Sequence, residues 1–89
     1  MVAAYYKRMD RANAIRLLKA LVASGANSNR LMANAWVRDI ALKDASLRGA
    51  ELASALAYAE GQGWIADGPR EGWTTITRAG ESAARLRIV

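Results

Sequence analysis

The sequence predicts a small, mainly α-helical domain with a β-hairpin near its end, an α+β fold. Apolar residues recur at helical spacing up to Gly61, and the period then changes to the alternation typical of strands. Apolar and aromatic residues make up 53 % of the 89 residues, but twenty of them are alanine, which suits helices in close contact. The chain has no linker, repeat or low-complexity run, so we expect a single domain over residues 1–89.

The first helix is predicted over about residues 11–24. Asp10 is a suitable N-cap, and apolar residues follow at helical spacing: Ala14, Ile15, Leu18, Leu21 and Val22. Gly25 follows Ser24 as a residue that can end the helix in the left-handed conformation.

A second helix is predicted over about residues 30–43, from an apolar stripe of Met32, Trp36, Val37, Ile40 and Ala41. Its start is open: either Ser28 caps it early, or Asn34 caps it late after a short extended segment. Trp36 is expected in the core or at a contact between subunits.

The third helix is predicted over about residues 47–60, with Ser46 as N-cap and Gly61 to Gly63 marking its end. We expect Leu52, Leu56 and Ala59 to face inward. The outer face would then consist of Arg48, Glu51, Ser54, Ala55 and Tyr58.

A hairpin follows over residues 64–77. Placing Ile65 opposite Ile76 puts both isoleucines on one face and leaves a four-residue tip, 69–72, between Gly68 and Trp73. Thr77 then caps a short closing helix over about residues 78–86.

The chain has no histidine and no cysteine, which limits the kinds of metal site and catalytic site that it can form. Their absence argues against zinc sites, disulfides, thiol catalysis and Ser-His-Asp machinery, so we expect no enzyme, no metal and no cofactor. Thirteen basic residues, ten of them arginine, oppose eight acidic ones and give a net charge of +5. Such a balance favours a polyanionic partner, although it also fits simple solubility.

The order of elements resembles the winged helix-turn-helix, with its three-helix core, two-stranded wing and closing C-terminal helix. The run from Leu52 through Gly61-Gln62-Gly63-Trp64-Ile65 looks like a recognition helix that leads into a wing. Ile76-Thr77-Arg78-Ala79-Gly80 resembles the Leu-Thr-x-x-Gly motif of MarR- and PadR-like regulators, and the likeness spans about residues 10–86. It implies a helix 47–60 that enters the major groove of double-stranded DNA while the wing contacts the backbone.

On this resemblance we expect nine residues to contact DNA: Arg38, Lys43, Ser46, Arg48, Glu51, Ser54, Tyr58, Arg70 and Arg78. Arg48 is the expected base reader, since its guanidinium can bind guanine O6 and N7. Glu51 either accepts from cytosine N4 or pairs with Arg48, three residues away. Serines and Tyr58 would contact phosphates or bases, and the other cations would neutralise phosphate.

These residues predict a cytoplasmic transcriptional regulator with no membrane segment. Winged-helix regulators usually form dimers through terminal helices, so a homodimer through Tyr5–Arg8 and Arg85–Val89 is expected, unless these are the ends of a fragment.

The rival hypothesis is a winged-helix module that binds or assembles with proteins. Arginines 38, 48, 70 and 78 on one face would favour DNA, whereas their dispersal beside an apolar patch would favour protein. Trp64 and Trp73 share a hairpin face, where they either stack on a partner or pack the hairpin; RNA binding ranks below both hypotheses.

Overall fold

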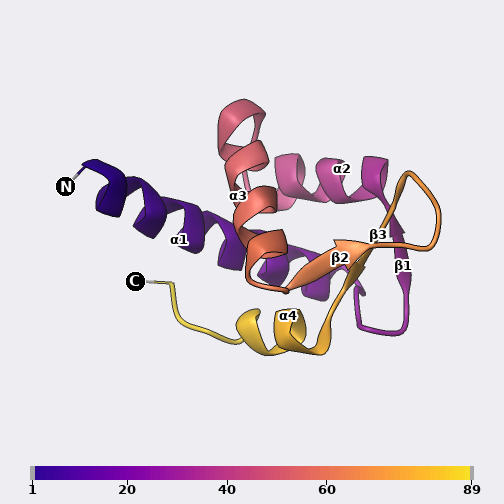
Figure 1. Ribbon diagram of the computed structural model, residues 1–89. Helices are drawn as coiled ribbons and strands as arrows, with labels where there is room; N and C mark the ends of the chain where they lie inside the picture. Colours follow the sequence, from indigo (N-terminus) through magenta and orange to yellow (C-terminus); the bar gives the residue numbers. More distant parts are fainter. Residues whose placement is uncertain (1, 89) are drawn as a thin grey trace.

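Four helices and a three-stranded antiparallel sheet form the fold (Figure 1). The computed structural model describes the backbone of residues 2–88 and the side chains of residues 9–88. The elements in chain order are α1 (Val2–Ala23), β1 (Leu31–Ala33), α2 (Asn34–Asp44), α3 (Gly49–Gly61), β2 (Ile65–Asp67), β3 (Trp73–Ile76) and α4 (Arg78–Ala83). The predicted α+β class is confirmed.

Helix α1 is longer than predicted at its start and ends where predicted. Asp10 does not cap it, because the preceding residues contain no glycine or proline and continue the helix back to Val2. At the other end Gly25 has a φ of +105°, and the Ala26 N–H donates to the Leu21 carbonyl at 2.9 Å. This is the left-handed cap that a glycine permits.

The predicted helix over 30–43 begins too early. Residues 31–33 form β1, which pairs with β3 in the register Leu31 with Thr75, so the alternative with a short extended segment is correct. Asn34 is the first helical residue and not the cap. Its side-chain oxygen instead accepts a hydrogen bond from the Thr74 hydroxyl of β3 at 2.6 Å, so the Asn34 side chain links α2 to the sheet and does not cap the helix.

The hairpin register is confirmed, but the sheet is larger than the two strands predicted. Ile65 lies opposite Ile76, and the Gly68 N–H donates to the Trp73 carbonyl at 2.8 Å. The strand order is β1-β3-β2, which places β3 in the centre.

Helix α4 begins where predicted and ends earlier. The Thr77 hydroxyl accepts from the Gly80 N–H at 3.0 Å, the expected N-cap. The helix stops at Ala83 instead of Leu86, and the chain continues as a turn and an extended segment.

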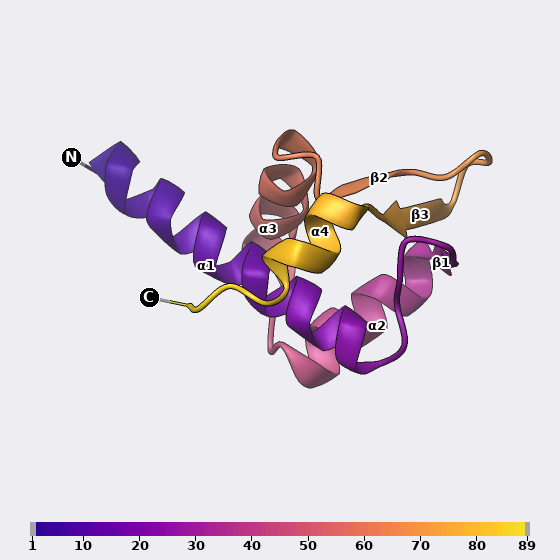
Figure 2. The same ribbon diagram turned by 90° about the horizontal axis from the view of Figure 1, so that it is seen from below.

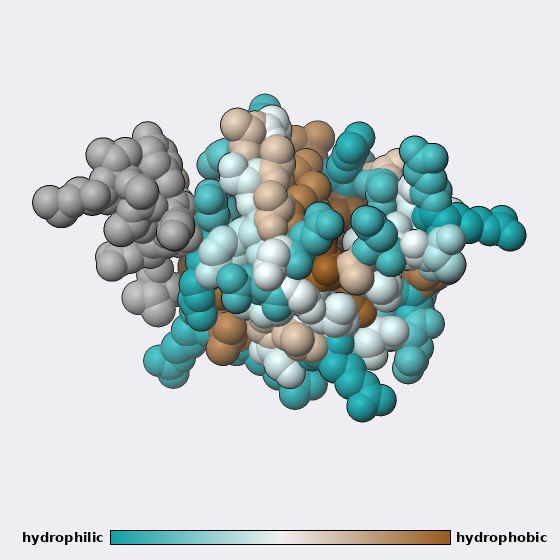
Figure 3. Space-filling model, in the orientation of Figure 1, coloured by the Kyte–Doolittle hydropathy of each residue, from teal (hydrophilic) through white to brown (hydrophobic). Residues whose placement is uncertain are grey.

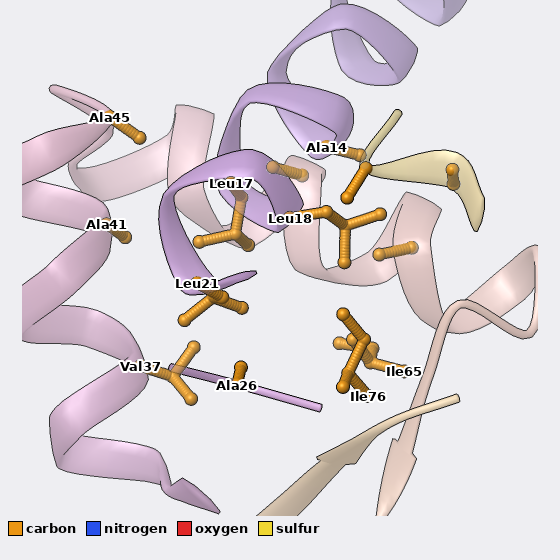
Figure 4. Close-up of a cluster of buried hydrophobic side chains, with 14 of the residues drawn as sticks. Ala14, Leu17, Leu18, Leu21, Ala26, Val37, Ala41, Ala45, Ile65 and Ile76 are labelled. Carbon is orange, nitrogen blue, oxygen red and sulfur yellow. The ribbon is translucent and has the colours of Figure 1, made fainter. Parts of the chain in front are cut away.

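The core is built around α1, which packs against each of the other three helices (Figures 1 and 2). Figure 4 shows its inner side chains together with the isoleucines of the hairpin. The fully buried large side chains are Ile15, Leu17, Leu18, Leu21, Leu47 and Ile76. Trp36 is half-buried against this core.

Three cations bind carbonyl groups at the ends of helices. Arg16 donates to the Ala45 carbonyl at the end of α2 (2.5 Å), and Lys19 to the Ala84 carbonyl at the end of α4 (2.8 Å). Arg30 donates to the carbonyl of Gly25, just beyond α1 (3.3 Å). A cation at a helix C-terminus donates to carbonyl groups that lack a partner within the helix, and its charge interacts favourably with the negative end of the helix dipole.

Within residues 2–88, no helix combines the length and the apolar character needed to cross a membrane.

Candidate nucleic-acid interface

A groove lies where α2, α3 and the hairpin meet. It encloses about 160 Å³ and is lined by Asn34, Val37, Arg38, Leu56, Glu60, Ile65, Ala66, Asp67 and Thr74. Its floor is apolar and its rim is charged. In Figure 3, tan and brown atoms run along α3 and into the surface beside it, with teal side chains around them.

A shallow wing pocket continues this groove toward the tip of the hairpin. It is lined by residues 67–73 together with Asn34, so Asn34 and Asp67 belong to both cavities. Arg38 stands in the groove and Arg70 at the wing pocket, and both side chains are exposed. The structure therefore brings these two predicted contacts onto one continuous surface.

Carboxylates share this surface with the arginines. Glu60 and Asp67 line the groove, and Glu71 lines the wing pocket. Neither Arg38 nor Arg70 forms a salt bridge with these carboxylates. The salt bridge found within residues 9–88 joins Lys43 and Asp39 on α2. The two arginines thus have no salt-bridge partner among the described residues, but the nearby carboxylates partly cancel their positive electrostatic potential.

Charge is distributed very unevenly along the chain. Residues 34–77, from α2 to the end of the hairpin, contain four basic and six acidic residues, a net charge of −2. The rest of the chain contains nine basic and two acidic residues, a net charge of +7, and the two parts sum to the +5 of the whole. The positive balance that favours a polyanion lies mostly outside the predicted DNA-binding segment.

The outer face of α3 differs from the prediction. Ala55 is fully buried at 0 % exposure together with Ala59, whereas Leu52 and Leu56 are only half-buried. Small side chains occupy the closest approach to α1 because alanines let two helices come near, and the leucines pack at the sides. The exposed ridge of α3 is consequently Ala50, Ala53 and Ala57, flanked by Glu51 and Glu60.

Two of the predicted contacts on α3 are less exposed than expected. Ser54 and Tyr58 are half-buried. The ring of Tyr58 packs against Trp64 with centroids 5.7 Å apart and an interplanar angle of 59°. This tilted pair favours the packing interpretation of Trp64 over a stacking surface.

The turn before α3 is arranged differently from the predicted cap. Ser46 is exposed with a φ of +55° and does not cap the helix, which begins at Gly49 after Arg48 in the N-cap position. Leu47 explains this, because its side chain is fully buried and its N–H donates to the Ala41 carbonyl at 2.9 Å. Anchoring Leu47 forces the residue before it into the left-handed region.

Arg48 is exposed at the start of α3, and it forms no salt bridge with Glu51. Lys43 is paired with Asp39 at 3.2 Å, one helical turn away. Arg78 begins α4, which lies near the end of α3 and away from Arg48 (Figure 1). A helix of 13 residues is about 20 Å long, so Arg48 and Arg78 do not act on one short stretch of phosphates.

Sequence reasoning missed the side chains that complete the groove, namely Asn34, Glu60, Asp67 and Thr74. The confirmed hairpin register contained a signal for two of them, since Asp67 and Thr74 are opposite each other and share the face of Ile65 and Ile76. Glu60 comes one helical turn after Leu56, so the two side chains lie on the same face of α3. No pattern in the neighbouring sequence predicted that Asn34 lines the groove, because its position depends on the pairing of β1 with β3.

The predicted surface on Tyr5–Arg8 lies outside the residues whose side chains the structure describes. Residues 85–88 are described and exposed, including Leu86 at 39 % and Ile88 at 42 %. In the described part of the chain, no group of three or more acidic side chains is arranged to hold a metal ion.

Comparisons of the chain with models of protein families, with curated proteins and with solved structures found no match.

Proposed function

We propose that the protein binds double-stranded DNA as a winged helix-turn-helix domain and acts as a transcriptional regulator. In this proposal α2 and α3 form the helix-turn-helix and the β2–β3 hairpin is the wing. The support is the order of the elements, with a strand before α2, and the central position of β3 in the sheet.

One observation carries the proposal: three exposed arginines without a salt bridge to a described residue come one each from α2, the turn before α3 and the wing. They are, in that order, Arg38, Arg48 and Arg70. A helix whose outer side chains are Ala50, Ala53 and Ala57 is slim enough to approach base edges in a groove about 12 Å wide.

The roles follow from this arrangement. Arg48, at the N-terminus of α3, is the residue that we propose to bind a guanine edge, while the alanine methyl groups contact thymine methyls. Arg38 and Arg70 neutralise phosphates on either side of the groove. With these two cations on phosphates, the logarithm of affinity should fall with the logarithm of salt concentration with a slope of about −1.8.

Fluorescence anisotropy with a random-sequence duplex over a salt series tests the proposal. The variant Arg48→Ala/Arg70→Ala should weaken binding and reduce the slope by about 0.9, because Arg70 is the one of the two that contacts a phosphate. Its matched control, Arg85→Ala/Arg87→Ala, removes the same charge from the C-terminal segment and should leave the slope unchanged. A larger loss in the control would show that DNA binds the opposite side of the molecule.

A second candidate function, a module that binds protein, is favoured by a specific observation. The net charge of −2 over residues 34–77 and the apolar floor of the groove suit a partner with apolar and basic side chains better than phosphate. Negligible DNA binding even at low salt would reject the first proposal and favour this one.

A further inference from the structure

Strand β1 forms an outer edge of the sheet. β3 separates it from β2, and among the described residues no further strand pairs with its other side. Its sequence is Leu31-Met32-Ala33, a short strand without the charge, proline or bulge that also protect edges. Its outer backbone groups can pair with a further strand.

The direction of the backbone groups follows from one hydrogen bond. The Asn34 N–H donates to the Gly72 carbonyl at 2.9 Å, in the same register as the β1–β3 pairs. Because hydrogen-bonded and non-bonded pairs alternate in an antiparallel ladder, the N–H and C=O groups of Leu31 and Ala33 point away from β3. The bond from the Gly68 N–H to the Trp73 carbonyl agrees, since Trp73 lies opposite Ala33 and bonds to β2 instead.

Three backbone groups are therefore directed outward and available. They are the N–H of Ala33 and both the N–H and the C=O of Leu31. The Ala33 carbonyl is occupied, because as N-cap of α2 it accepts the first hydrogen bond of that helix.

The side chains at this edge are apolar. Leu31 is 49 % exposed and Trp73 is 40 % exposed. Both lie on the sheet face opposite the one that buries Met32 and Ile76. Beside the strand, Trp36 borders a pocket with residues 25–26 and 30–33.

We propose that β1 pairs antiparallel with β1 of a second copy of this chain, around a two-fold axis at Met32. In this register Leu31 lies opposite Ala33 of the second copy. The Ala33 N–H donates to the Leu31 carbonyl of the second copy, and the symmetric bond forms in return. The two Leu31 side chains become diagonal neighbours on the open sheet face, and Trp73 of each copy extends this stripe.

The charge distribution suits a second copy at this edge. Two molecules of net charge +5 repel each other at long range, and residues 24–37 carry a single charge, that of Arg30. The edge thus adds little repulsion of its own when two copies approach. The pairing is self-complementary, as a two-fold interface requires. It does not depend on DNA binding.

Sedimentation of the full chain between about 10 µM and about 1 mM tests the pairing, since edge contacts of this size associate weakly. Leu31→Lys places a charge on the edge. Its matched control is Leu42→Lys, which changes an equally exposed leucine (47 %) near the far end of α2. The dimer dissociation constant should rise about tenfold or more in Leu31→Lys and stay within about twofold in the control.

Ala33→Pro tests the hydrogen bonds separately. Ala33 has φ −64° and ψ 137°, the conformation that proline prefers, and its N–H is not part of the ladder with β3. This variant should fold, as circular dichroism will show, and should weaken the dimer about tenfold by removing both symmetric bonds. If Ala33→Pro fails to fold, the test relies on Leu31→Lys and on the Ala33 amide resonance of the unmodified chain, which should shift with protein concentration if this N–H bonds in the dimer.

A chain that remains monomeric at the highest concentration overturns the proposal. A dimer that tolerates both edge variants also overturns it. If such a dimer is lost in Leu86→Lys/Ile88→Lys, the terminal segments form the interface instead.

Discussion

The two sides of this molecule use the same cationic residues differently. Around α1, Arg16 and Lys19 donate to the carbonyl groups that end α2 and α4. Around the groove, Arg38 and Arg70 have no salt bridge to a described residue and share their surface with carboxylates. Part of the net charge of this domain therefore stabilises the fold and is not available to a ligand, whereas the arginines of the groove side are. A basic isoelectric point alone does not locate a binding surface.

The largest expected effect is at Gly80, where the hairpin joins the α1 side through α4. A Cβ atom at this position would collide with the Trp64 carbonyl oxygen and would lie 2.8 Å from Cγ1 of Ile76. Gly80→Ala should therefore lower the free energy of unfolding by about 2–3 kcal/mol, measured by urea denaturation.

The control for this change is Gly61→Ala at the end of α3, where an added Cβ meets nothing within 4 Å. It should be neutral or slightly stabilising, because alanine is the better helix former. Equal losses in both variants would contradict the collision.

Removing a helix-end cation is expected to have the next largest effect. Arg16→Met keeps most of the apolar stem but leaves the Ala45 carbonyl without its charged donor. We expect a loss of about 1.5–3 kcal/mol in chemical denaturation. Arg11→Met, on an exposed position of the same helix, should leave stability unchanged.

Removing negative charge from the groove should strengthen DNA binding more than removing the same charge elsewhere on the molecule. Glu60→Gln/Asp67→Asn removes two negative charges beside Arg38 and should tighten duplex binding about three- to tenfold at low salt. Asp10→Asn/Glu81→Gln makes the same change in charge on α1 and α4, and anisotropy should show a smaller gain. An equal gain in both would mean that only the net charge matters.

The smallest effect is expected at the exposed pair of Lys43 and Asp39. Both side chains are more than half exposed, so Lys43→Met should cost at most about 0.5 kcal/mol. The difference should vanish in molar salt, because screening removes the interaction. A loss that persists at high salt would assign Lys43 a packing role.

The elements that the sequence predicts well are those whose information is local. The glycine at the end of α1, the isoleucine pair of the hairpin and the Thr77 cap each depend on a few neighbouring residues, and all three are confirmed. Strand β1 is different, because its pattern fits a helix equally well and only pairing with β3, some 40 residues later, decides its conformation.

The candidate site was predicted less well for the same reason. Arg38, Arg48 and Arg70 are exposed as expected, because charged side chains rarely pack inside. The rotation of α3 was predicted only in part. Ala59 is buried as predicted, but Ala55, expected on the outer face, is also fully buried, and Leu52 and Leu56 are only half-buried against the core. Which small residues meet another helix depends on how near that helix comes, and this distance is not encoded in the periodicity of α3 alone.

The burial of α3 through Ala55 and Ala59 also bears on how such a protein can evolve. The residues that fix the position of the helix are separate from those on its exposed ridge, Ala50, Ala53 and Ala57. Substitutions on the ridge change the chemistry presented to a ligand without disturbing the contact with α1. New binding preferences are thus accessible through single substitutions on an unchanged scaffold, and a library randomised at these three positions would sample them.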